Sequence, residues 1–96
     1  MELLVSYDIN TETSEGQRRL REVAKICEGF GQRVQKSVFE CQLEPQQVRR
    51  LAHALRSTID PTTDRVAIYR LREPYVRYVT LIGQGPSLDW RRPIIL

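Results

Sequence analysis

Asp8 is the residue of this sequence whose type and position most favour chemistry. It follows an apolar run at residues 3–5 and an aromatic residue, Tyr7, which together are typical of a buried strand. A carboxylate at the mouth of such a strand is either a solvated strand end, as most are, or part of a site. One carboxylate supplies only one or two of the roughly six oxygens that Mg²⁺ prefers. Two copies of Asp8 facing each other across a two-fold axis could hold Mg²⁺ or Mn²⁺, which activates water for phosphodiester hydrolysis.

The other reactive residue types do not form a recognisable site. The single histidine, His53, falls among arginines on the outward side of a predicted helix, where a surface role is the simpler interpretation. No Ser-His-Asp or Cys-His arrangement can be built with it, and there is no glycine-rich phosphate loop. Two cysteines, Cys27 and Cys41, are too few for a disulfide scaffold, and neither has a second cysteine or histidine at zinc-finger spacing. We therefore expect both in the core.

The basic residues favour a nucleic-acid partner. Thirteen of the fifteen are arginine, and the net charge is −2 over residues 1–48 but +5 over residues 49–96. Arginine matches phosphate oxygens with a planar fork, although a GC-rich genome would also enrich it. No segment resembles an aromatic base-stacking strand, so contacts should go to phosphates rather than bases. The candidate phosphate ligands are Arg49, Arg50, Arg56 and Arg77.

The apolar periodicity predicts an α+β order of strand, helix, strand, strand, helix, strand. We expect strands over residues 1–10, 33–35, 38–43 and 64–71, and helices over residues 17–29 and 45–59. Thr11 or Ser14 should cap the first helix, and Gly29 or Gly31 should end it in a left-handed conformation. This order fits a ferredoxin-like βαββαβ fold, a four-stranded antiparallel sheet with both helices on one face.

The second face of that sheet needs a cover, and no third helix is predicted. A second copy of the chain is the economical solution, so we expect a homodimer. The extended run from Tyr75 to Ile82 should add as a strand to the partner's sheet edge. We therefore predict a domain over residues 1–82 and a tail over residues 83–96 whose aliphatic end docks on a partner. With no signal peptide or membrane-spanning run, the chain should be cytoplasmic.

Two motifs and one helix residue are similar to a known family. They are Tyr7-Asp8-Ile9 at the end of the first strand, Arg19 in the first helix, and the run Gly31-x-Arg33-Val34-Gln35-x-Ser37-Val38-Phe39-Glu40. Together, within residues 3–71, they resemble the small CRISPR-associated adaptation proteins of the Cas-two family. The second motif is the more specific, because a chance match to its ordered residues is improbable.

The resemblance implies a ferredoxin-like fold, a homodimer with paired sheets, and a divalent metal between the two copies of Asp8. It also implies metal-dependent endonuclease activity on RNA or double-stranded DNA. The implied partner is the CRISPR integrase, with which the dimer captures DNA for insertion as a new spacer.

Carried over to this chain, the resemblance assigns Asp8 as the metal ligand and a catalytic set of Asp8, Arg19, Arg33 and Phe39. Ser37 matches a motif serine. The family commonly has Ser or Thr two residues after the aspartate, where this chain has Asn10, so a hydroxyl role there is in doubt.

Three functions stay open at this point. The chain could be a metal-dependent phosphodiesterase, with Arg19 and Arg33 on the phosphate. It could be a scaffold dimer that bridges the integrase and holds duplex DNA on its arginine rows. It could also be a toxin-like endoribonuclease on the same fold. We favour the scaffold, with a weak intrinsic nuclease beside it.

Overall fold

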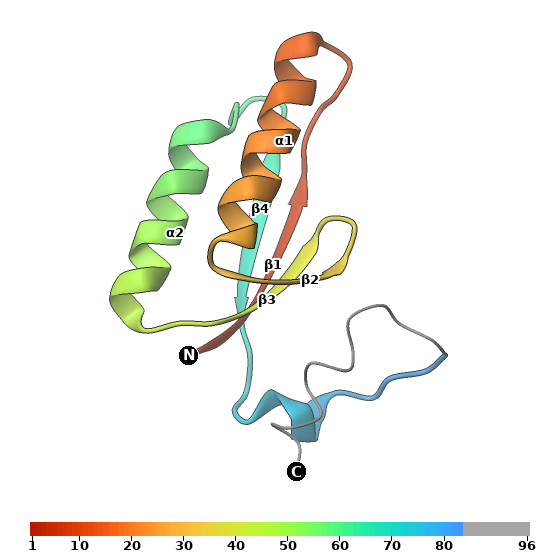
Figure 1. Cartoon of the computed structure of the whole chain (residues 1–96), viewed down its shortest axis with the longest axis vertical. Coiled ribbons are helices and arrows are strands. Elements are labelled where there is room, and N and C mark those ends of the chain that lie inside the picture. The colour runs from red at the N-terminus through yellow and green to blue at the C-terminus, as the bar shows by residue number, and fades with distance from the viewer. Residues whose placement is uncertain (84–96) are drawn as a thin grey trace.

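Strands and helices follow one another in the predicted order in a computed structural model, which describes residues 1–83 (Figure 1). The elements are β1 (Glu2–Asp8), α1 (Ser14–Glu28), β2 (Gly31–Gln35), β3 (Val38–Gln42), α2 (Pro45–Thr58), β4 (Arg65–Arg70) and a 3-10 helix, η1 (Tyr75–Tyr78). The predicted βαββαβ arrangement is therefore confirmed.

The four strands form one antiparallel sheet in the order β2-β3-β1-β4, which places β1 in the interior. Both helices lie against the same face of this sheet (Figure 1). On β1, Val5 pairs with Phe39 of β3 and with Ile68 of β4. At the end of the strand, Asp8 pairs with Arg65, the first residue of β4. The topology thus brings an acid and a base together at one end of the sheet.

The core lies between the sheet and the helices. Successive side chains of a strand point to opposite faces, so Leu3, Val5 and Tyr7 of β1 face the helices and are buried. The helices contribute their apolar stripes, with Leu51 fully buried among them. The alternate residues of β1 belong to the other face, which neither α1 nor α2 covers (Figure 1).

Both cysteines belong to this core, as predicted. Cys27 is 0% exposed and Cys41 is 5% exposed, and neither forms a disulfide. Burial raises the pKa of Cys27 to about 12 and that of Cys41 to about 11. The two thiols therefore stay protonated near neutral pH and act as small apolar side chains.

Helix α1 starts at Ser14, three residues before the predicted start, and its capping residue differs from both candidates. Neither Thr11 nor Ser14 caps the helix; the hydroxyl of Thr13 accepts the hydrogen bond from the backbone N–H of Gly16, at 3.0 Å. At the other end, Gly29 has a right-handed backbone (φ −75°), so no left-handed cap forms there. The helix ends at Glu28, and two residues later Gly31 begins β2 so close to Glu40 and Cys41 that a Cβ there would clash with both.

Helix α2 begins as the sequence suggests. Pro45 is its first residue, where the missing backbone donor costs nothing, and the side chain of Gln47 accepts from the backbone N–H of Glu44 at 2.8 Å. Leu51 and Leu55 are its buried residues. Within residues 1–83, no helix combines the length and apolar character that crossing a bilayer requires.

The segment after β4 differs from the predicted extended run, whereas its predicted addition to a partner's sheet stays a prediction. Tyr75 to Ile82 is not an extended strand in this chain: Tyr75–Tyr78 form η1, and residues 79–82 have no regular structure. The physical reason is a set of polar contacts to the chain's own sheet. The backbone N–H of Tyr75 donates to the Glu2 carboxylate at 2.9 Å, and its phenol donates to the Glu40 carboxylate at 2.6 Å. The predicted docking tail, from residue 84 onward, lies outside the described residues.

Candidate functional site

Asp8 lies exposed at the end of β1, on the sheet face that the helices leave uncovered. A shallow cavity of about 250 Å³ opens beside it. Its lining comes from adjacent positions of β1 and β4, namely Ser6, Tyr7, Asp8, Arg65, Ala67 and Tyr69. The cavity therefore offers one carboxylate, one guanidinium and an aromatic side chain to a ligand on that face.

One chain alone does not fit a resident Mg²⁺. Among residues 1–83, no three His, Cys, Asp or Glu side chains come close enough together to hold a metal ion. Asp8 supplies a single carboxylate, and its cross-strand partner Arg65 is a cation. A hard divalent ion needs about six oxygens, so a second carboxylate and further ligands would have to come from outside this chain.

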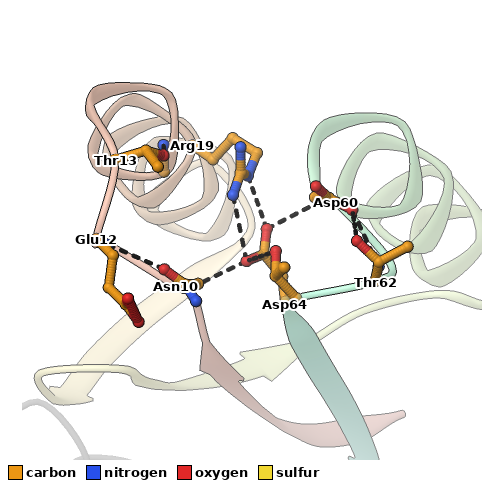
Figure 2. A network of polar contacts seen from close by, with 9 residues as sticks. Asn10, Glu12, Thr13, Arg19, Asp60, Thr62 and Asp64 are labelled. Atoms are coloured by element: carbon orange, nitrogen blue, oxygen red, sulfur yellow. Dashed lines mark hydrogen bonds and ion pairs between the residues drawn. The ribbon is translucent and has the colours of Figure 1, made fainter.

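Arg19 is bound to an acid that the sequence analysis did not select. Its Nε donates to Oδ2 of Asp64 at 2.8 Å, and its Nη2 reaches Oδ1 at 3.5 Å (Figure 2). The side chain of Asp64 is 0% exposed and that of Arg19 is 17% exposed. This edge of the Arg19 guanidinium, which extends from α1, therefore faces the buried carboxylate of Asp64 rather than the cavity beside Asp8.

Asp64 accepts further hydrogen bonds around the same carboxylate. The backbone N–H groups of Asn10 and Asp60 donate to it at 3.0 and 2.9 Å, and the hydroxyl of Thr63 donates at 3.2 Å. Burial alone would raise the pKa of Asp64, but the hydrogen bonds from Arg19 and the backbone outweigh it and hold that pKa well below its usual range. The carboxylate is thus ionised and joins three segments of the chain (Figure 2).

Arg33 and Phe39 form a separate cluster on the helix side of the sheet. The Arg33 guanidinium lies 4.9 Å from the centre of the Phe39 ring, and Phe39 stacks on Tyr7 with ring centres 6.2 Å apart. Arg33 also donates to the Lys36 carbonyl at 2.6 Å and pairs with the Glu28 carboxylate at 3.3 Å. Burial raises the pKa of the Tyr7 phenol, partly opposed by Arg33.

The predicted catalytic residues therefore do not converge within one chain. Asp8 belongs to the uncovered sheet face, Arg33 belongs to the helix side, and Phe39 is 0% exposed in the core. Arg19 belongs to the Asp64 network. The sequence analysis missed Asp64 and Arg65, although an antiparallel β4 beside β1 would have placed the start of β4 against the end of β1.

The predicted phosphate ligands are all exposed but come from two elements. Arg49, Arg50 and Arg56 lie on α2, and His53 is exposed on the same helix, as expected of a surface residue. Arg77 lies in η1. Three of the four predicted phosphate ligands therefore form a basic surface on α2, and Arg77 belongs to a different element.

The fold and this site define a ferredoxin-like α+β protein whose interior strand ends in an exposed acid. Comparison with known proteins gives the particular family. The family model described as CRISPR associated protein Cas2 matches residues 1–79, and the chain belongs to that family.

Relatives support the same assignment along the whole chain. A protein of Moorella thermoacetica, named CRISPR-associated endoribonuclease Cas2 1, is 47% identical over 96 residues, covering 100% of both chains. One of Chlorobaculum tepidum, named CRISPR-associated endoribonuclease Cas2, is 51% identical over 96 residues, again covering 100% of both. The crystal structure of Streptococcus pyogenes Cas2 at pH 6.5 matches with a TM-score of 0.77 and 47% identity, covering 86% of this chain and 100% of that one.

Proposed function

We propose that this chain acts in CRISPR adaptation as a symmetric dimer that binds duplex DNA and bridges the integrase. A weak Mg²⁺-dependent endonuclease activity, on RNA or double-stranded DNA, accompanies this role in the cytoplasm. Membership of the Cas2 family supports the CRISPR association, and the relatives' names, endoribonuclease and endonuclease, support the nuclease. The observation that carries the proposal is the exposed Asp8 at the edge of an uncovered sheet face.

A second copy of the chain is the proposed cover for that face. Leu4, Val38 and Ala67 are only half buried on it, and Tyr69 is 51% exposed. Apolar side chains on a sheet face are stabilised when another surface removes them from water. A two-fold axis near the end of β1 would then bring the two Asp8 carboxylates toward each other.

The paired Asp8 carboxylates are the proposed ligands of Mg²⁺ or Mn²⁺. When bound, such an ion activates water and neutralises charge on a phosphate. Arg65, across from Asp8 on β4, is placed to contact a phosphate oxygen beside that site. The chain thus supplies the carboxylate and a neighbouring cation, and the second subunit supplies the matching pair.

Duplex DNA is the proposed ligand of the exposed arginines. Arg49, Arg50 and Arg56 on α2, together with Arg77, can contact the phosphate backbone without reading bases. Contacts of this kind release counterions, so affinity should fall steeply with salt. Binding to the phosphate backbone without reading bases is what a scaffold for DNA of many sequences requires.

The nuclease part is tested with Asp8→Ala. We expect this variant to lose cleavage of RNA and DNA while keeping the dimer, because Asp8 is exposed and contributes no core packing. Cleavage with Mg²⁺ and the mass in solution are measured together. Glu12→Ala removes another exposed acid a few residues away and serves as the control. Undiminished cleavage by Asp8→Ala would rule out the metal mechanism.

The scaffold part is tested by reversing charge on α2. Arg49→Glu with Arg50→Glu should weaken duplex DNA binding and flatten its salt dependence, since each phosphate contact contributes about 0.9 to the slope of log K against log salt. Arg18→Glu with Arg21→Glu reverses two exposed charges on α1 and is the control. Spacer insertion should fall with the α2 variant and survive Asp8→Ala. Equal losses in the α2 and α1 variants would show that only overall charge matters.

A toxin-like endoribonuclease is the second candidate, and the name of the relatives, endoribonuclease, favours it. In that case expression of the chain should slow growth, and Asp8→Ala should relieve the effect. Cleavage should then be confined to RNA, with no requirement for the integrase. Normal growth on expression of the intact chain would argue against this candidate.

A further inference from the structure

We propose that Arg19 and Asp64 are positioning residues for Asp8 and that Arg19 does not bind substrate phosphate. Asp64 holds the backbone that follows Asp8, and Arg19 holds Asp64. The inference rests on the proposed function only in taking Asp8 as the site's ligand. It departs from the role that the family resemblance suggests for Arg19, which is a place near the reacting phosphate.

The first step concerns the loop between β1 and α1. Asp64 accepts the backbone N–H of Asn10, two residues beyond Asp8, at 3.0 Å. The Asn10 side chain in turn accepts the backbone N–H of Glu12 at 2.9 Å. A Cβ at Gly16 would clash with the Asn10 carbonyl, so helix α1 packs directly against this backbone. The chain leaving Asp8 is therefore held from both sides.

The second step concerns the donors of Arg19. One edge of its guanidinium points to Asp64, through Nε at 2.8 Å and Nη2 at 3.5 Å, and its side chain is only 17% exposed. A phosphate could bind to this edge only by displacing a carboxylate whose side chain is 0% exposed. That would leave a buried charge without its main partner, which is strongly unfavourable.

The third step concerns Arg65. Asp64 is adjacent to it in sequence, and Arg65 pairs with Asp8 across β1 and β4. The backbone N–H of Asp60 and the hydroxyl of Thr63 also bind the Asp64 carboxylate, at 2.9 and 3.2 Å. One buried carboxylate thus joins the loop after β1, helix α1 and the loop before β4 (Figure 2).

The consequence for a symmetric site is direct. A two-fold axis repeats any displacement of Asp8 in the second subunit, so the separation of the two Asp8 carboxylates changes by the sum of the two displacements. Metal ligands require their distances to be kept within a few tenths of an ångström. Residues that hold a ligand in place typically change metal affinity by about 10-fold to 100-fold when they are replaced.

The role of Arg19 is decided first by DNA binding. Arg19→Gln and Arg18→Gln each remove one positive charge from the same turn of α1, but Arg18 is exposed and Arg19 is paired. If Arg19 only holds Asp64 in place, both variants should show the same small change in the slope of log K against log salt, which comes from the loss of one positive charge. A slope that falls by about 0.9 in Arg19→Gln alone would mean a lost phosphate contact and would overturn the proposal.

The positioning role is decided by two readouts that do not require cleavage. In Arg19→Gln and Asp64→Asn, we expect faster hydrogen exchange at the Asn10 amide and about 10-fold weaker Mn²⁺ binding to the dimer without nucleic acid. The double variant should be no worse than the more severe single variant, because Arg19 acts through Asp64. Thr62→Ala is the control: it removes a hydroxyl that donates to Asp60 at 2.6 Å and leaves the hydrogen bonds of the Asp64 carboxylate in place.

These outcomes separate the inference from the proposed function. If Asp8→Ala binds Mn²⁺ as well as the intact chain, the proposed metal site is wrong, yet Asn10 exchange and the salt slope still decide what Arg19 does. If Asn10 exchange is unchanged in both variants at matched stability, Asp64 does not hold the loop and the positioning role is wrong.

Discussion

At the scale of single residues, the partners of each arginine decide which of them can meet a phosphate. Arg19 is bound to a buried carboxylate, and Arg33 lies over an aromatic ring while donating to a carbonyl and a carboxylate. Arg49, Arg50 and Arg65 are exposed on the surface. The paired arginines therefore serve the structure first, and the exposed ones are the better candidates for nucleic acid.

The ionised Asp64 predicts how stability depends on pH. Its pKa is lowered from the ordinary value of 3.8 on folding, so its contribution is fully present above that value and is lost as the pH falls toward the folded pKa. Asp64→Asn should therefore lower the free energy of unfolding at neutral pH by about 2 kcal/mol, less than for a fully buried pair because Arg19 keeps some contact with water. The difference from the intact chain should shrink in acid, measured by urea unfolding from neutral pH to about pH 2. A difference that stays constant over this range would contradict the assignment.

At the scale of elements, the C-terminal segment shows how polar contacts override a local preference. The sequence around η1 is rich in β-formers, yet the segment turns back onto the sheet at Tyr75. Tyr75 is 8% exposed, and it bonds to Glu2 of β1 and Glu40 of β3. β1 and β3 are the two interior strands of the sheet, so η1 is anchored at one end of the face that α1 and α2 leave free rather than along an edge strand.

Removing the phenol should test that anchor. Tyr75→Phe loses the hydroxyl that donates to Glu40 at 2.6 Å and leaves a buried carboxylate short of one donor. We expect the free energy of unfolding to fall by about 1–2 kcal/mol. Tyr78→Phe, at a tyrosine that is 54% exposed, is the matched control and should have little effect. Equal unfolding curves for the two variants would show that η1 is held by other contacts.

At the scale of the whole molecule, the two sheet faces are unequal. One is covered by α1 and α2, and the other carries Asp8, half-buried apolar residues and η1 at one end (Figure 1). A four-stranded sheet with one open face has a direction in which a second copy can add. The proposed dimer and the proposed metal site depend on the same surface, so a change there should affect both.

A charge placed on that surface should separate the subunits. Ala67 lies in the cavity beside Asp8, so Ala67→Arg puts a guanidinium where the proposed partner sheet would pack. We expect a folded monomer by sedimentation equilibrium, with an unchanged helix and strand content by circular dichroism. Gln46→Arg adds the same charge to the exposed surface of α2 and should remain a dimer. A dimer in both variants would place the subunit contact elsewhere.

Local patterns determined much of this protein from its sequence. The period of the apolar residues predicted the order of strands and helices and the buried cysteines, because each depends on neighbours within a few residues. The antiparallel sheet was predicted only because this order of elements fits the ferredoxin-like fold. The exposed acid at the end of β1 was visible for the same reason. The capping residue of α1 was missed because several hydroxyl residues lie within a few positions of one another.

Tertiary structure alone decided which side chains meet. Arg19 and Asp64 are 45 residues apart, and Tyr75 is 73 residues from Glu2, so no local pattern could pair them. Strand order brought the start of β4 beside the end of β1 and thereby set Arg65 against Asp8. The period of apolar residues indicates which side of a helix or strand is buried. A polar contact between distant segments forms only when the chain folds, because a buried charge is unfavourable unless it is paired.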